Sequence, residues 1–368
     1  MQRVRIHGGA AAGVALVAMA LSLAACSSSS SSSGSTASSS PSSGSSGSGS
    51  TAKVSGTLNG SGSTFQLTFQ QDAIAGVKSV QPSLTVNYGG GGSGKGLTDL
   101  ASGTVNYAGS DAPATPAQAA GFKSSVLYFP VVIGPITMAY NLSGVSKLQL
   151  SAPVIAQIFE GKITSWNNAA IKADNPGVTL PSTAITIAVR SDSSGTTSNF
   201  SSFLVKAAGS GWTLGHGSII KWPSSARAGT GNPGVAQIVK STPGAIGYVD
   251  YATAKASSLS FASVKNQTGA YIAPSPTSAS AAASHITPAA NLTFSAVWAP
   301  GADSYPITYQ SWDLVYAKQS SASTAQALQA WIGYLIGSGQ SLLPNLGYAP
   351  LPANIDSLAK AQLTKITG

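Results

Sequence analysis

The sequence predicts an α/β protein in which strands alternate with helices and mostly parallel sheets result. Residues 84–88 alternate between apolar and polar side chains, as a half-buried strand does, and a glycine run and a helical stretch follow them. Residues 185–189 alternate in the same way and lead into a Ser-Gly-Thr-Thr helix start. Residues 56–368 are more than one hydrophobic core usually supports, so we expect two lobes.

Residues 1–25 have the pattern of an export signal. Arg3 and Arg5 form a short basic region, and the apolar stretch 10–25 is too short and too rich in small residues for a membrane span. The stretch ends at Cys26, the only cysteine of the chain, which excludes a disulfide framework and a thiolate metal cluster. An isolated cysteine is often an inert buried thiol, but Leu-Ala-Ala-Cys before a serine tract resembles the lipobox of bacterial lipoproteins. We therefore expect cleavage after Ala25 and acylation of Cys26, for example by palmitate, which would anchor the exported chain to the outer face of the cytoplasmic membrane.

Residues 26–55 consist of Ser, Gly, Thr and little else, so we expect them to form a flexible tether. Loss of Arg3 and Arg5 with the leader lowers the formal net charge of +9 by two. The remaining positive charge is carried mainly by scattered lysines, which favour the attraction of anions. These lysines form no stripe and no binding motif, so nucleic acid is not an expected partner.

The other elements follow in chain order. Apolar residues at helical spacing predict a helix after Phe65: Phe69, Ala73, Val77 and Val80. A short helix is expected from Leu97 and a strand at 105–107. A long apolar strand is expected at 128–141 despite Pro130 and Pro135, and a helix with a serine cap and an early proline begins at Ser151. Because ligands of open α/β sheets bind at the carboxyl ends of strands, the turns after these strands can meet at one cleft.

Arg190 indicates what kind of ligand that cleft would take. Only 8% of the residues are charged, and Arg190 and Arg227 are the two arginines outside the leader. Arg190 stands between a predicted strand and a helix start. Its guanidinium is a planar fork suited to a tetrahedral oxyanion, and the helix start supplies hydroxyls and backbone N–H groups. The combination predicts a pocket for a small anion.

Each neighbouring motif also has a simpler interpretation. Asp111 in Gly-Ser-Asp-Ala-Pro and Asp192 are both typical turn residues, although Asp192 is also placed to orient Arg190. Ser194, Gly195 and Thr196 are compatible with a plain helix cap. The run 89–95 nearly spells a nucleotide-binding P-loop, but Gly96 stands where that motif needs Ser or Thr, and an exported chain has no ATP supply. This run is then either a flexible glycine turn or a loop in which Ser93 and its backbone approach a ligand closely.

The sequence gives little support for catalysis or for a cofactor. His216 and His285 are the histidines outside the leader, and neither lies in a catalytic motif. There is no Gly-x-Ser-x-Gly elbow, and the one glutamate, Glu160, and the scattered aspartates form no metal-ligand pattern. We therefore expect a binding protein without enzymatic activity, metal or cofactor.

Nine stretches in one order carry a resemblance to a known family: residues 60–65, 86–88, 109–113, 129–134, 159–167, 175–177, 190–197, 221–223 and 243–251. In these stretches the chain resembles the phosphate-binding lipoprotein that supplies the high-affinity phosphate ABC transporter of bacteria. The resemblance runs from about Leu58 to Lys255 and continues more weakly to about Asn345.

The resemblance implies a two-lobed periplasmic-binding-protein fold, in which each lobe is a mixed sheet flanked by helices and strands join the lobes. Lobe I would comprise residues 56–130 and 260–368, and lobe II residues 131–259, with crossings near 131–141 and 247–258. The resemblance also implies phosphate ligands in both lobes: Thr64, Phe65, Ser93 and Asp111 from the first, and Arg190, Ser194, Gly195 and Thr196 from the second. Asp192 falls on the aspartate that braces the arginine.

The implied partners are inorganic phosphate and the membrane permease and ATPase subunits of a phosphate ABC transporter, with the chain itself a monomer. The chain departs from the family pattern at Lys95 and Ser193, where glycine is usual, at Gln66, where proline is frequent, and at Thr230, where lysine is usual. These departures bear on affinity more than on the identity of the ligand. The alternatives are another oxyanion such as sulfate or molybdate, a surface phosphatase or hydrolase, and an adhesin.

Overall fold

The computed structural model describes residues 53–368, and every structural statement below concerns that part of the chain. The predicted leader, Cys26 and most of the predicted tether lie outside the described residues. Near the start of the described part, the Val54 N–H donates to Gln81 Oε1 at 2.9 Å. No helix in residues 53–368 combines the length and the apolar character needed to cross a membrane.

The first sheet has the strand order β2-β1-β3-β11-β4. Its strands are β1 (Gly56–Gly62), β2 (Leu84–Gly89), β3 (Tyr107–Ser110), β11 (Thr308–Tyr316) and the first part of β4 (Val126–Tyr140). β1 runs parallel to β2 and β3, whereas β11 runs antiparallel to β3 and β4. The carboxyl ends of β1, β2 and β3 therefore lie at one edge, where the turns that follow them carry polar residues.

The second sheet continues from the other end of β4. Residues 126–135 of β4 pair with β11, and residues 136–140 pair with β8 (Ala245–Asp250). β8 is followed across the sheet by β6 (Thr186–Arg190) and β7 (Arg227–Gly229), all three parallel. β9 (Ser260–Lys265) also pairs with β4, and the two-residue strands β5 (Gln149–Leu150) and β10 (Tyr271–Ile272) pair with β9.

The long strand β4 contains both of the prolines in its sequence, and the ladder is irregular opposite the first of them. Its residues are buried from Tyr128 to the end of the strand. The register with β11 shifts between Ser311 and Trp312, and Trp312 faces Pro130. Such an irregularity suits proline, which has no N–H to give to the ladder. β11 enters the first sheet from the side at which β4 leaves it. The two strands therefore run antiparallel, and the sheets are mixed, as the family resemblance implied. The alternation of strands and helices taken alone predicted mostly parallel sheets.

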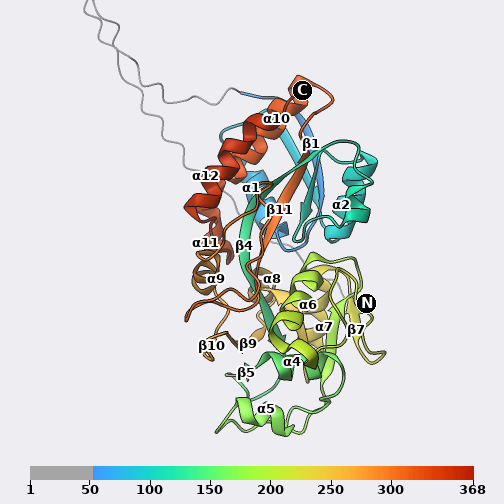
Figure 1. The fold of residues 1–368 in the computed structure, drawn as a ribbon, viewed down its shortest axis with the longest axis vertical. Coiled ribbons are helices and arrows are strands. Elements are labelled where there is room, and N and C mark those ends of the chain that lie inside the picture. The colour runs from blue at the N-terminus through green and yellow to red at the C-terminus, as the bar shows by residue number, and fades with distance from the viewer. Residues whose placement is uncertain (1–52) are drawn as a thin grey trace, which may run out of the picture. The chain divides into compact units, whose positions relative to one another are not determined.

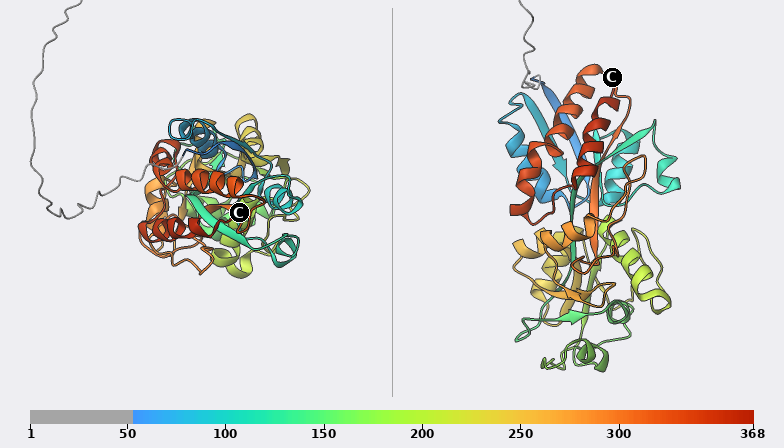
Figure 2. Two further views of the ribbon diagram at one scale, coloured as in Figure 1. Left: turned by 90° about the horizontal axis from the view of Figure 1, so that it is seen from above. Right: turned by 60° about the vertical axis from the view of Figure 1, so that its left-hand side comes forward.

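Helices cover both sheets (Figures 1 and 2). Those of the first sheet include α1 (Leu67–Val77), α2 (Ser93–Ser102), α10 (Ala322–Leu335) and α12 (Ala353–Gln362). Those of the second include α4 (Ala152–Phe159), α6 (Gly195–Ala208), α7 (Gly231–Ser241) and α8 (Tyr251–Ala256). The remaining α-helices are α3 (Pro116–Ala119), α5 (Ala169–Asp174), α9 (Pro276–Ala283) and α11 (Leu343–Leu346). In Figure 1, β4 runs from the upper group of elements to the lower one, and the red C-terminal helices lie in the upper group with the blue N-terminal strands.

Two helix boundaries differ from the sequence prediction. α1 buries Phe69, Ala73 and Val77, but it ends before Val80, which is 38% exposed and belongs to no apolar face. α2 begins at Ser93 and not at Leu97. It can begin there because Gly92 takes a φ of 90°, which L side chains rarely adopt, and this turns the glycine loop directly into a helix N-terminus. Ser93 is thereby the first residue of a helix.

The proposed lobe boundaries stay a prediction, and the strand pairing bears on both of them. The crossing expected at 131–141 falls within β4, whose pairing changes from β11 to β8 at residue 136. β9 begins at residue 260, where we expected the chain to be in lobe I. It nevertheless pairs with the second part of β4, and its Ala262 and Val264 are fully buried there. Strand pairing thus favours a return to the first sheet later in the chain, where it leads into β11.

Candidate anion-binding site

Arg190, the last residue of β6, has a fixed and almost fully buried side chain. Its Nε donates to Asp192 Oδ1 at 2.8 Å, and its Nη2 donates to Asp192 Oδ2, so the guanidinium and the carboxylate form a bidentate ion pair. Its Nη1 donates to Thr196 Oγ1 at 3.3 Å. Burial alone would raise the pKa of the Asp192 carboxyl, but the hydrogen bonds and charge of Arg190 outweigh it and lower that pKa. A full positive charge is therefore held in one orientation with 1% of its side chain exposed.

The N-terminus of α6 lies beside this arginine. Ser194 is the cap residue, and its Oγ accepts from the Thr197 N–H at 3.1 Å. Gly195 and Thr196 are the first two residues of the helix, where backbone N–H groups have no partner within the helix. Both residues are buried. The positive end of a helix thus adjoins a guanidinium, an arrangement that favours a negative charge between them.

Asp111, which follows β3, faces this positive region from the first sheet. It is 1% exposed. Its Oδ1 accepts from the hydroxyls of Ser63 and Ser311, the latter at 2.7 Å, and its Oδ2 accepts from Ser93 Oγ at 3.4 Å. Burial raises the pKa of Asp111 to about 6, against the lowering effect of the hydrogen bonds from Ser63 and Ser311 and of the Arg190 charge. The site therefore contains a buried hydrogen-bond acceptor among its donors.

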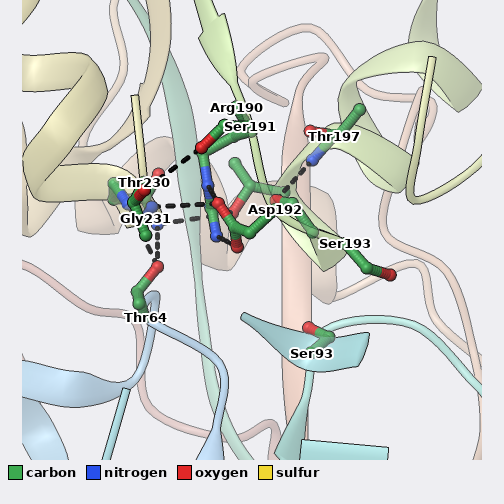
Figure 3. A network of polar contacts seen from close by, with 12 residues as sticks. Thr64, Ser93, Arg190, Ser191, Asp192, Ser193, Thr197, Thr230 and Gly231 are labelled. Atoms are coloured by element: carbon green, nitrogen blue, oxygen red, sulfur yellow. Dashed lines mark hydrogen bonds and ion pairs between the residues drawn. The ribbon is translucent and has the colours of Figure 1, made fainter. Parts of the chain in front are cut away.

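The two sheets meet directly at this point. Gly195 N–H donates to Ser93 Oγ at 3.2 Å, and Asn199 Nδ2 on α6 donates to the Asp111 carbonyl at 2.7 Å. A cavity of about 330 Å³ borders Ser93 and Gly195 on one side of this contact. In Figure 3 the Arg190 fork faces Asp192, while Ser93 and Thr64 approach from below. Every residue that the resemblance implied lies at or next to this junction: Thr64, Phe65, Ser93, Asp111, Arg190, Asp192, Ser194, Gly195 and Thr196.

Two of these residues make hydrogen bonds within the protein that the sequence analysis did not predict. The Phe65 N–H, expected as a ligand, donates to Ser63 Oγ at 3.0 Å, and the Phe65 ring stacks on Tyr309 with 4.0 Å between centroids. The Thr64 hydroxyl accepts from the backbone N–H of Asn232 at 3.1 Å and from its Nδ2 at 3.3 Å. Thr64 thus belongs to a contact with α7 that the sequence analysis did not include.

Sequence reasoning missed Asn232 and the serines around Asp111. Asn232 is the second residue of α7 and is fully buried, and Thr230, which departs from the family pattern, is the cap residue of that helix. An asparagine after a glycine at a helix start was the available signal. Ser63 lies in the stretch 60–65 that carries the family resemblance, but the resemblance implied no role for it. Ser311 lies on β11, far from Asp111 in sequence, so no local pattern indicated it.

The three departures closest to the site each contact neighbouring protein groups. Lys95 Nζ lies 2.5 Å from Asp99 Oδ2, one helical turn along α2. Ser193 Oγ bonds Ser218 Oγ at 3.0 Å, and the Ser193 carbonyl accepts from the Gly94 N–H at 3.0 Å. Thr230 Oγ1 lies 3.1 Å from Ser191 Oγ. In these contacts none of the three bonds Arg190 or Asp111.

Comparison with known proteins gives a family and a set of relatives. A family model described as a PBP superfamily domain matches residues 47–338. The phosphate-binding protein PstS of Xylella fastidiosa is 37% identical over 239 residues, which cover 63% of this chain and 65% of the relative. The chain thus spans just under two thirds of that relative. Phosphate-binding protein PstS 3 of Mycobacterium tuberculosis is 34% identical over 312 residues, which cover 82% of this chain and 84% of the relative.

Solved structures confirm the predicted fold class. The periplasmic phosphate-binding protein PfluDING with bound phosphate superposes with a TM-score of 0.71 at 20% identity, over 83% of this chain and 93% of that one. The phosphate-binding protein of Stenotrophomonas maltophilia gives a TM-score of 0.68 at 18% identity, over 83% and 93%. At these identities the likeness concerns the fold, which is the mixed α/β fold of periplasmic binding proteins.

Proposed function

The chain belongs to the PBP superfamily and, within it, to the phosphate-binding PstS proteins, and from this premise we propose that it binds inorganic phosphate where its two sheets meet. We also propose that it is exported, carries phosphate to an ABC-type import permease with its ATPase subunits, and works as a monomer held to the membrane by a lipid on Cys26. The proposed lobes are residues 56–130 with 260–368, and 131–259.

The donors at the junction match what a phosphate dianion loses when it leaves water. Burying an anion is costly unless protein hydrogen bonds replace its hydration. Arg190 supplies a full positive charge, and the start of α6 supplies N–H groups at the positive end of a helix dipole. Because these groups belong to one sheet and Ser93 and Asp111 to the other, a ligand that touches both favours the closed arrangement.

The observation that carries the choice of phosphate is the buried carboxylate of Asp111 among these donors. An ionised carboxylate only accepts hydrogen bonds, and phosphate near neutral pH still carries a proton to give. Sulfate carries none, so its oxygens would meet the carboxylate oxygens with no proton between them. This contact between buried like charges is expected to reject sulfate by about a thousandfold.

Calorimetric titration with phosphate and with sulfate tests this proposal. The titrations are run at pH 8, above the pKa of about 6 at Asp111, so that the carboxylate is ionised. We expect tight phosphate binding and weak sulfate binding by the wild type. Asp111→Asn offers an amide donor, so the ratio of the two affinities should narrow, mainly through better sulfate binding. Asp303→Asn, a change at an exposed aspartate, is the control.

Two results would contradict the proposal. Equal affinity of the wild type for sulfate and phosphate would show that Asp111 does not select phosphate. An unchanged ratio of the two affinities in Asp111→Asn would show the same. The proposal also predicts that the protein turns over no phosphate ester. Hydrolysis of a chromogenic phosphate ester by the wild type would identify an enzyme instead.

A further inference from the structure

Asn232 connects both halves of the site through one buried carboxamide. It is fully buried near the start of α7. Its Nδ2 lies 3.3 Å from Thr64 Oγ1 on the first sheet and 3.3 Å from Thr196 Oγ1 on the second. Its Oδ1 accepts from the Asp250 N–H at 3.4 Å. A backbone N–H can only donate, so this contact requires the amide oxygen to face Asp250 and the NH₂ group to face the two hydroxyls.

The turn that holds Asn232 is shaped for this contact. Gly231 has a φ of 68°, and a Cβ there would lie 3.1 Å from Thr64 Cγ2, so the backbone approaches Thr64 more closely than a larger residue easily allows. The Gly231 N–H donates to Asp192 Oδ1 at 2.9 Å. The same turn thus braces the carboxylate that orients Arg190. Figure 3 shows the Thr64 side chain pointing at this turn.

The hydrogen bonds leave each threonine hydroxyl with only a proton to offer. A hydroxyl has two acceptor positions and one donor. Thr64 Oγ1 accepts from the backbone N–H and the Nδ2 of Asn232. Thr196 Oγ1 accepts from Arg190 Nη1 and from Asn232 Nδ2. With both acceptor positions of each oxygen used, the remaining group on each hydroxyl is its O–H donor.

We propose that Asn232 is a positioning residue that sets the hydroxyls of Thr64 and Thr196 as donors to the oxygens of a tetrahedral anion. This rests on the proposed function, since phosphate oxygens accept the hydrogen bonds that these hydroxyls would give. Without the amide each hydroxyl gains a free acceptor position and turns its proton elsewhere at little cost. A carboxylate in place of the amide would take the protons itself.

The experiment measures phosphate affinity by calorimetry in four variants, each made in the same purified protein as the wild type. Asn232→Ala should weaken phosphate binding by about ten- to a hundredfold. Asn232→Asp should weaken it further, because its carboxylate accepts both hydroxyl protons. Asn232→Ser, which keeps one small donor, should fall between Asn232→Ala and the wild type. Asn141→Ala is the matched control: Asn141 Nδ2 donates to the carbonyls of Val239 and Lys240 at the other end of α7, so the variant perturbs the helix and should leave affinity unchanged.

A double-mutant cycle separates positioning from a general loss of packing. Thr64→Val keeps the shape of the side chain and removes its hydroxyl. If Asn232 acts through that hydroxyl, Asn232→Ser should cost several-fold less affinity in the Thr64→Val background than in the wild type. Equal costs in the two backgrounds, or wild-type affinity in Asn232→Ala, would overturn the inference. Wild-type protein that binds no phosphate would instead contradict the proposed function, so the two failures are distinguishable.

Discussion

The Oγ of Ser93 accepts a hydrogen bond from the Gly195 N–H at 3.2 Å, although 102 residues separate them. Ser93 is the first residue of α2 and Gly195 the first residue of α6, so the N-termini of two helices meet across the junction of the sheets. A Cβ on Gly195 would lie 2.5 Å from Ser93 Oγ and 2.6 Å from Asp111 Cβ. Only glycine allows this approach.

Gly195→Ala should therefore impair closure without harming the fold. Alanine is the better helix former, by about 1 kcal/mol in a helix interior, so α6 itself should tolerate the change. With the two helix ends held apart, phosphate affinity should fall by about a hundredfold or more, as calorimetry would show. Gly333→Ala in α10 is the control, since its Cβ would meet Leu363 Cδ1 at an ordinary 3.5 Å. Tight phosphate binding by Gly195→Ala would show that this contact does not belong to the bound state.

Replacement of Arg190 should remove the only full positive charge that bonds the site residues in the described part of the chain. Hydrogen bonds to charged groups contribute about 1.5–3 kcal/mol each, and a guanidinium fork can make two to phosphate. Arg190→Ala should weaken phosphate binding by roughly a hundredfold or more. Arg227→Ala should change it little, because Arg227 is exposed and donates to Thr242 Oγ1 at 3.2 Å. If Arg227→Ala weakened phosphate binding more than Arg190→Ala in a calorimetric titration, the phosphate site would not lie at Arg190.

Stability should depend on pH through Asp250. Burial raises the pKa of this carboxyl to about 7 from an ordinary 3.8, and its Oδ2 has no hydrogen-bond partner among the described residues. The folded chain therefore binds more protons than the unfolded chain between about pH 4 and pH 7, and the free energy of unfolding should fall as pH rises through that window. The full window corresponds to up to about 4 kcal/mol.

Asp250→Asn isolates this effect. Asparagine can still cap α8, where Asp250 Oδ1 now accepts from the Thr253 N–H at 2.8 Å. The variant should unfold at a higher denaturant concentration than the wild type at pH 8 and at a similar one at pH 4. A gain of equal size at both pH values would assign the effect to something other than ionisation. Asp303→Asn again serves as the exposed control.

Lipidation of Cys26 is tested by metabolic labelling with a fatty-acid analogue. The Leu-Ala-Ala-Cys sequence before a serine tract motivates the expectation, and Cys26 is the only thiol of the chain. The wild type should take up the label and Cys26→Ser should not. Equal labelling of the two proteins would mean that another residue, or none specifically, carries the lipid.

The parts of the fold and site that the sequence predicted are those with a local signal. The alternation of apolar and polar residues predicted β6. The arginine between this strand and a helix start predicted the role of Arg190 and the cap of α6, because strand, ligand and cap are consecutive in the chain. Asn232 had only a weak local signal, the glycine before it at a helix start, and its partner Thr64 is 168 residues away. The antiparallel pairing of β4 with β11 was missed for the same reason. Contacts between distant segments depend on how the chain returns to a sheet, which no window of sequence records.

The division of β4 between two sheets has a consequence for unfolding. Its first part exchanges backbone hydrogen bonds with β11 and its second part with β8 and β9, while one uninterrupted buried strand carries both. Melting of either sheet would leave half of β4 without hydrogen-bond partners and would expose the apolar residues of that half. The other half of β4 would still be paired. The free energies of the two halves are therefore coupled, and neither half can be lost alone at low cost. Residues 53–368 should lose their structure in a single cooperative denaturant transition.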